Sequence, residues 1–185
     1  MSELSFVMST IALVLYSCSY FFNNKRNYLI LQLSGNVFLS LSYMLIGSFF
    51  TMVAAIIGIA RGLICYLYEK RDKRVPVYWI VSLCIASILS YIIINTVILS
   101  QASIWDFLYL FASCMYAISF AIRNLRVMRY VVLIPHASAV AYNLLIKAPI
   151  SSAISYGIEL VVTVVAIIKY EVYKAKYNNK LVENR

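Results

Sequence analysis

The sequence predicts an all-α integral membrane protein whose seven transmembrane helices form two parallel three-helix repeats joined by a linking helix (3+1+3). Three observations lead to this prediction. Seven apolar runs fill the 185 residues, and each is close to the ~20 residues that a helix needs to cross the bilayer core. The Lys and Arg residues gather at alternate ends of these runs. Hydrophobic residues make up 63% of the chain and charged residues 12%, which is too apolar for a soluble domain of this length.

Each run is separated from the next by a short polar or turn-forming connection. Along the chain, the runs are 4–22, 28–47, 48–68, 76–96, 102–122, 127–147 and 150–168. The first run has no basic segment before it, so it does not resemble a cleaved signal peptide and we expect it to remain in the mature protein. We divide the chain into a first three-helix repeat (1–74), a linking transmembrane helix (75–99), a second three-helix repeat (100–172) and a cytoplasmic tail (173–185).

The positive charge indicates how the chain is oriented. Of the 16 Lys and Arg residues, 14 flank the runs on one side, Lys147 lies on the other side, and Arg61 lies inside a run. Because Lys and Arg are retained on the cytoplasmic face, this pattern predicts an external N-terminus and a cytoplasmic C-terminus. The formal charge of +9 falls in short juxtamembrane clusters, which fit lipid headgroups better than nucleic acid. We therefore expect the lipid bilayer, and no nucleic acid, as a partner.

The first three runs and the last three share one pattern of connections, in which a basic connection is followed by a short external turn and then by a second basic segment. Sequence matches support a repeat at spacings of 96 or 99 residues: Ser17-Cys18 with Ser113-Cys114, Tyr43 with Tyr142, and Gly58 with Gly157. Direct fusion of two three-helix units would invert the second one. A single linking helix restores the orientation and gives parallel repeats, which are a transporter architecture.

Several short motifs carry a resemblance to a known family. They are Asn23-Asn24-Lys25-Arg26-Asn27, Leu31-Gln32-x-x-x-Asn36, Tyr43-x-x-x-Gly47, Ala54-Ala55-x-x-Gly58, Arg61, Tyr142-Asn143 and Gly157-x-Glu159. Over nearly its whole length the chain resembles the YgjV family of bacterial inner-membrane proteins. The resemblance implies a multi-pass protein of the bacterial inner membrane, related to the SWEET, PQ-loop and PnuC transporters. One departure is that no Pro-Gln pair is present; Pro135 is followed by His136.

Polar residues within the apolar runs are the candidate site, because charges in hydrocarbon are costly and usually mark function or a pair. The candidate substrate-binding residues are Asn36, Tyr43, Arg61, His136, Tyr142, Asn143 and Glu159. At ~1.5 Å per residue, the charged members fall in the middle or inner half of the bilayer. We expect Arg61 and Glu159 to form an ion pair between the repeats; in the alternative, they lock the halves together or Arg61 reaches the inner interface with its long stem.

The remaining candidates each have two interpretations. His136 is the only histidine, and it serves either as a proton relay, since imidazole exchanges protons near neutral pH, or as a hydrogen-bonded packing residue. Asn36, Asn143 and the two tyrosines either donate hydrogen bonds to a polar solute or bond between helices.

The function that these features predict is a small-molecule transporter or facilitator with a central polar cavity, and its solute is a small polar metabolite, neutral or zwitterionic. The alternative is a non-transporting membrane scaffold or ligand sensor. No phosphate loop, dinucleotide motif or metal-ligand spacing is present, so we expect neither an enzyme, nor a cofactor, nor a metal site. A homo-oligomer is compatible with the sequence.

Overall fold

Seven helices and no strand make up the part of the chain that the computed structural model describes, which is residues 3–47, 49–94, 105–145 and 150–183. Side chains are described within these ranges except at 49–51, 106, 150–153 and 171–183. The helices are α1 (Glu3–Ser19), α2 (Lys25–Leu45), α3 (Phe49–Lys70), α4 (Val77–Ile93), α5 (Asp106–Ala121), α6 (Leu125–Leu145) and α7 (Ile150–Glu183). The all-α prediction is therefore confirmed. Of the expected external turns at Gly47-Ser48 and Lys147-Ala148-Pro149, only Gly47 lies within the described residues.

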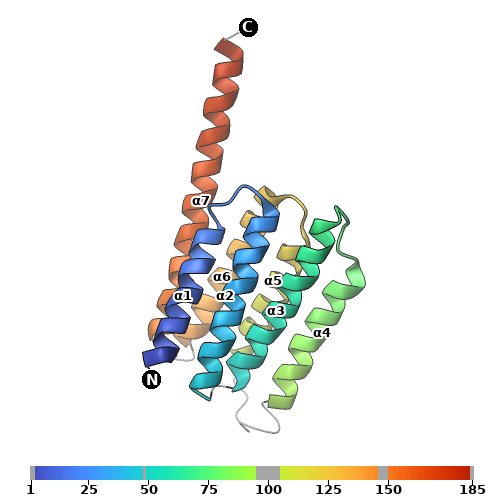
Figure 1. Ribbon diagram of the computed structural model, residues 1–185, viewed down its shortest axis with the longest axis vertical. Helices are drawn as coiled ribbons and strands as arrows, with labels where there is room; N and C mark the ends of the chain where they lie inside the picture. Colours follow the sequence, from blue (N-terminus) through green and yellow to red (C-terminus); the bar gives the residue numbers. More distant parts are fainter. Residues whose placement is uncertain (1–2, 48, 95–104, 146–149, 184–185) are drawn as a thin grey trace.

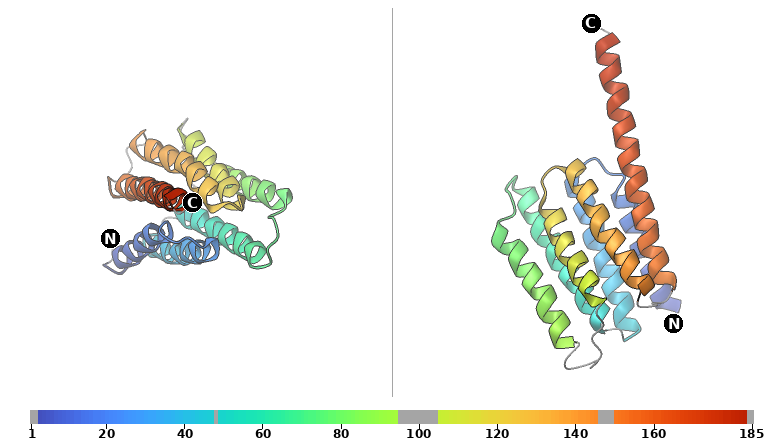
Figure 2. Two further views of the ribbon diagram at one scale, coloured as in Figure 1. Left: turned by 90° about the horizontal axis from the view of Figure 1, so that it is seen from above. Right: turned by 180° about the vertical axis from the view of Figure 1, so that it is seen from behind.

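The helices form two layers with α4 at one edge. Consecutive helices run in opposite directions, so α1, α3, α5 and α7 share one direction (Figure 1). Seen along the helices, α1, α2 and α3 lie on one side, and α5, α6 and α7 lie on the other (Figure 2). The layers meet where α1 packs on α7 and α3 packs on α5, and α4 packs against α3 and α5.

Local sequence explains where α2 and α6 begin. The side-chain oxygen of Asn24 accepts a hydrogen bond from the backbone N–H of Arg26 at 2.9 Å, and that of Asn124 accepts one from Arg126 at 3.0 Å. Such asparagine caps satisfy N–H groups that have no partner within the helix. At the other end of α2, Gly47 takes a φ of +68°, a left-handed conformation that ends helices and favours glycine.

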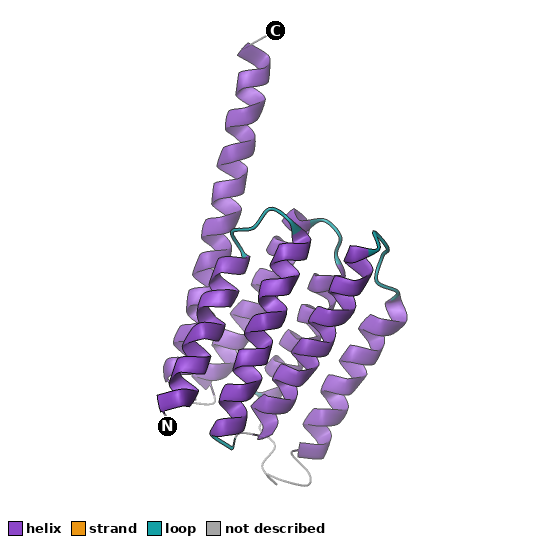
Figure 3. Ribbon diagram, in the orientation of Figure 1, coloured by secondary structure: helices purple, strands orange, loops and turns teal. Residues whose placement is uncertain are grey.

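The basic connections lie together at one end of the bundle. The loops at 20–24, 71–76 and 122–124 share that end (Figure 3). Lys25 at the start of α2 pairs with Glu69 near the end of α3, with 3.1 Å between Nζ and the carboxylate. Arg123 lies 3.6 Å from Asp72, so the loops at 71–76 and 122–124 also meet. The N-terminus lies at the opposite end (Figure 1).

Helix lengths differ from the expected runs. Within the described residues, Lys25–Leu45 and Met52–Lys70 are long and apolar enough to cross a membrane, whereas Glu3–Ser19, Val77–Ile93 and Phe107–Ala121 are apolar but shorter. The run expected to end near 168 instead continues as α7 to Glu183, and it projects well beyond the bundle (Figure 1). No proline or glycine follows Gly157, so nothing in the sequence interrupts the helix.

Burial recurs at a spacing of 100 residues across the first two helices of each layer. α2 and α6 begin and end 100 residues apart. Positions buried at both members of a pair are Ala12 and Ala112, Ser19 and Ser119, Tyr20 and Phe120, Tyr28 and Met128, Leu29 and Arg129, Gln32 and Val132, and Asn36 and His136. This register differs from the sequence spacing of 96, which aligned Tyr20 with Tyr116.

Candidate functional site

A fully buried histidine lies at the junction of the two layers. His136 on α6 is 0% exposed. Its Nδ1 lies 2.9 Å from the hydroxyl of Tyr116 on α5. Its Nε2 lies 2.9 Å from the hydroxyl of Tyr20, which follows α1, and 3.2 Å from the carboxylate of Glu159 on α7. One imidazole thus holds partners from three other segments of the chain.

These partners suit more than one protonation state of the His136 ring. When Nε2 carries the only proton, it donates toward Glu159, and Nδ1 accepts from the Tyr116 hydroxyl. When both nitrogens are protonated, Nδ1 donates to the same hydroxyl, because a phenol both donates and accepts. Both ring nitrogens of His136 therefore have a hydrogen-bond partner in either state.

Arg61 lies beside this cluster but does not pair with Glu159, so the expected ion pair is wrong. Within the described residues, the carboxylate of Glu159 pairs with His136. The Arg61 guanidinium lies over the rings of Tyr116, at 5.1 Å, and Phe120, at 4.6 Å. The physical reason is that α7 presents Glu159 to α6, whereas α3 presents Arg61 to the aromatic face of α5. The closer ring, Phe120, lies one residue before the end of α5 at the basic end of the bundle, so the alternative in which Arg61 reaches the inner interface stays a prediction.

The other four candidate residues have contacts of their own. Asn36 donates to the carbonyl of Gln32 on its own helix, at 2.8 Å, and its side chain fills the space over Gly58 where a Cβ would lie. Asn143 likewise donates to the carbonyl of Ala139, at 2.7 Å. Tyr142 packs on Tyr109, with 5.5 Å between the ring centroids, and Tyr43 is half-buried. The structure brings His136 and Glu159 into contact and leaves these four side chains outside that contact.

Sequence reasoning missed the tyrosines that complete the cluster. Tyr20 and Tyr116 hold the two nitrogens of His136, yet neither was a candidate residue. The signal that could have found them is the spacing of 100 residues set by Asn24 and Asn124. In that register the inward positions 16, 20, 116 and 120 are all aromatic.

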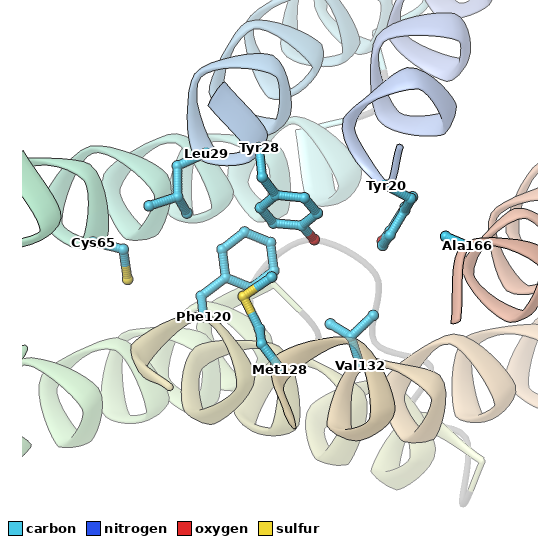
Figure 4. Close-up of a cluster of buried hydrophobic side chains, with 8 residues drawn as sticks. All are labelled: Tyr20, Tyr28, Leu29, Cys65, Phe120, Met128, Val132 and Ala166. Carbon is cyan, nitrogen blue, oxygen red and sulfur yellow. The ribbon is translucent and has the colours of Figure 1, made fainter. Parts of the chain in front are cut away.

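Aromatic and apolar side chains pack beside the polar cluster, toward the basic end of the bundle. Tyr20 and Tyr28 come from the first layer, and Phe120, Met128 and Val132 come from the second, with Leu29, Cys65 and Ala166 at the margin (Figure 4). The Tyr28 ring lies 5.4 Å from Tyr20 and 5.7 Å from Phe120. The hydroxyl of Tyr28 points into the centre of this group (Figure 4). Ring contacts across the layers therefore fix the geometry around His136.

A groove of about 420 Å³ lies elsewhere, at the basic end of α4 and α5. Its lining includes Arg74, Ile80, Ile118 and Arg123. It does not reach His136, so the central cavity expected from the sequence stays a prediction. Among the described residues, no three His, Cys, Asp or Glu side chains come together as metal ligands would.

Membrane-length apolar helices, one charged end and ionisable groups buried between the layers define a helical membrane protein. The chain belongs to the Imp-YgjV family of bacterial inner membrane proteins, whose family model matches residues 3–174. The resemblance read from the sequence motifs is thereby confirmed at the level of the family. No curated protein and no solved structure matches the chain, so the relation to SWEET, PQ-loop and PnuC transporters stays a prediction.

Proposed function

We propose that the protein is a multi-pass small-molecule transporter or facilitator of the inner membrane, with its solute path between the two layers. The observation that carries this proposal is the buried pair of His136 and Glu159, with Arg61 beside it. Charged groups inside a bilayer are costly. A bundle without a task could place leucine or alanine at these positions, so the presence of charged groups there points to a polar solute or a proton.

The relation between the layers supports a transporter. α1, α2 and α3 run in the same directions as α5, α6 and α7 (Figure 1), and burial recurs at 100 residues. If α1 corresponds to α5 and α3 to α7, a twofold relation between the layers makes the contact of α1 with α7 equivalent to that of α5 with α3. Both contacts are present. Such near-equivalence is what two parallel repeats would give, and parallel repeats can alternate access to a site between them.

The orientation that fits this function has the N-terminus outside and the C-terminus in the cytoplasm. Its support is the collection of Lys25, Arg74, Arg123 and their neighbours at the end opposite the N-terminus. We expect a C-terminal alkaline phosphatase fusion to be inactive and a C-terminal fluorescent protein to be bright. The opposite pair of results would contradict the orientation.

Solvent access to the interior tests the proposal directly. The four native cysteines, Cys18, Cys65, Cys84 and Cys114, are free thiols and are first removed. Single cysteines are then introduced at pairs of adjacent residues, one facing the interior of the bundle and the other facing its outside. Asn36 and Asn143 are 7% and 8% exposed, and they are compared with Val37 and Leu144, which are 41% and 65% exposed on the outer face.

We expect cysteines at the two asparagine positions to react with a small polar thiol reagent in intact membranes, because a solute path carries water. Cysteines at 37 and 144 should remain inert, because lipid covers them. Inertness at 36 and 143 in folded protein would contradict transport and favour the second candidate, a scaffold or ligand sensor. That candidate is supported by α7, which is 34 residues long from Ile150 to Glu183 and whose C-terminal part projects beyond the bundle, where it could present a bound state to a partner.

A further inference from the structure

We propose that Arg61 is the receptor for the carboxylate of a small, singly charged solute, which binds against the rings of Tyr116 and Phe120. That this solute passes through the membrane rests on the proposed function. That it binds at Arg61 does not. The inference also changes the expected solute, from a neutral or zwitterionic metabolite to a monocarboxylate.

The first observation is that the Arg61 guanidinium has hydrogen-bond donors and no acceptor. Its Nε is buried without a partner in the described part of the chain, and its contacts are the two rings of α5. Arg129 also has a buried Nε without a partner, but its guanidinium donates to the carbonyl of Phe22, and Lys25 pairs with Glu69. An arginine presents five N–H groups in a planar fork. A guanidinium that is held between helices without an acceptor is therefore placed to bind the acceptor atoms of a solute.

The second observation is a donor on the other side of the same ring. Tyr28 is 0% exposed, and its hydroxyl faces Tyr20, whose ring centroid lies 5.4 Å from that of Tyr28. Its ring lies 5.7 Å from Phe120, whose ring lies 4.6 Å from Arg61. The Tyr28 hydroxyl points into the group that Phe120 also lines (Figure 4). The Arg61 guanidinium and the buried Tyr28 hydroxyl therefore lie on either side of the Phe120 ring, and a buried polar group left unpaired is costly.

The charge of the neighbours selects the class of solute. Glu159 faces His136 at 3.2 Å, and within the described residues no carboxylate pairs with Arg61. One free guanidinium matches the two oxygens of a carboxylate. A doubly charged phosphate would have to lose far more hydration for the same single cation. The aromatic walls favour a solute whose remainder is uncharged.

Chemical protection of Arg61 tests the inference on the purified full chain in detergent. Phenylglyoxal modifies arginines, and peptide mass spectrometry gives the rate at each one. Benzoate is the probe, benzamide is its uncharged match, and inorganic phosphate is the second anion. When benzoate fills nine-tenths of the sites, modification of Arg61 should slow about tenfold, because only unoccupied protein reacts. Arg26 and Arg126, at the basic end, serve as internal controls and should not change.

Each other result overturns the inference. Equal effects of benzoate and benzamide would show that charge is not recognised. Equal effects of benzoate and phosphate would replace a monocarboxylate site with a general anion site. An Arg61 that phenylglyoxal never modifies, in protein whose other arginines react, would show that no small molecule reaches it.

Variants supply a second readout. Benzoate should raise the unfolding temperature of the parent and of Arg123→Gln, which removes an exposed cation, but not that of Arg61→Gln. If Arg61→Gln does not fold, the protection of the parent decides the matter. Uptake of radiolabelled benzoate by proteoliposomes separates the two proposals. Protection without uptake would retain the binding site and contradict transport, whereas uptake without protection would retain transport and contradict this site.

Discussion

The two layers match each other in the length, cap and burial of their second helix, but they differ in the chemistry of their buried side chains. α2 and α6 have the same length, begin after the same asparagine cap and bury equivalent positions 100 residues apart. The residue 12 positions after the cap is Asn36 in one layer and His136 in the other. Asn36 lies over Gly58 of α3, and His136 lies against Glu159 of α7. One layer therefore uses this position for close packing, and the other uses it for ionisable chemistry.

The difference shows where each layer finds its hydrogen-bond partners. Asn36 donates to the carbonyl of Gln32 within its own helix, so its polar group is satisfied wherever α2 lies. His136 depends on Tyr20, Tyr116 and Glu159, which come from three other segments. The first arrangement survives movement of the layers, but the second requires them to be docked. Relative motion of the layers would consequently be felt at His136 first.

The largest expected effect follows from removing one member of the buried pair. His136→Ala leaves the Glu159 carboxylate buried without its partner, and breaking such a pair destabilises by about 3–5 kcal/mol. Asn36→Ala, the matched change in the other layer, removes a hydrogen bond within one helix and should cost about 1 kcal/mol. Unfolding by SDS titration in detergent micelles measures both free energies. Equal losses would contradict the asymmetry between the layers.

A double-mutant cycle checks that the pair is His136 with Glu159 and not Arg61 with Glu159. His136→Ala combined with Glu159→Leu should recover much of the loss, because no unpaired charge then remains. Arg61→Leu combined with Glu159→Leu should be close to additive, because the two side chains form no ion pair. A large coupling for the second combination would restore the pairing expected from the sequence.

An intermediate effect distinguishes two glycines that the sequence treats as equivalent. A Cβ at Gly58 would collide with the side chain of Asn36, whereas one at Gly157 meets open space. Gly58→Ala should therefore cost about 1–3 kcal/mol through overpacking, and Gly157→Ala should change stability by less than about 0.5 kcal/mol. Gly58→Ala in an Asn36→Ala background should lose most of its penalty, since the obstructing amide is gone. Equal effects at the two glycines would favour the sequence spacing of 99.

Much of the architecture follows from the sequence alone, for identifiable reasons. Apolar length and flanking charge report directly on helices and their ends, so α2 and α3 lie close to the expected runs, and Lys25 and Arg123 lie at one end as expected. The positions of His136 and Glu159 within apolar runs likewise identify them as candidates from the sequence, because hydrocarbon tolerates few such residues.

The pairing of Glu159 with His136 could not be predicted from the sequence, because it depends on how each helix is rotated about its axis. One residue of misalignment turns a helix face by about 100°. The sequence spacing of 99 placed Gly157 opposite Gly58, whereas the contacts of Asn36 and His136 place Glu159 there. That shift of two residues moves Glu159 away from Arg61 and toward His136. Tyr116 was overlooked for the same reason, since a spacing of 96 aligned it with Tyr20 and not with Tyr16.

The smallest expected effect tests whether the two layers begin their second helix with equivalent caps. Asn24 and Asn124 cap α2 and α6 with the same bond, at 2.9 and 3.0 Å, and loss of such a cap costs about 1 kcal/mol. Asn24→Ala and Asn124→Ala should therefore destabilise by equal amounts in SDS unfolding, and Asn24→Asp and Asn124→Asp should retain most of the stability, because aspartate caps as well. Since both caps lie on the surface, neither change disturbs packing. A loss confined to one layer would mean that the common spacing of 100 residues does not extend to the helix starts.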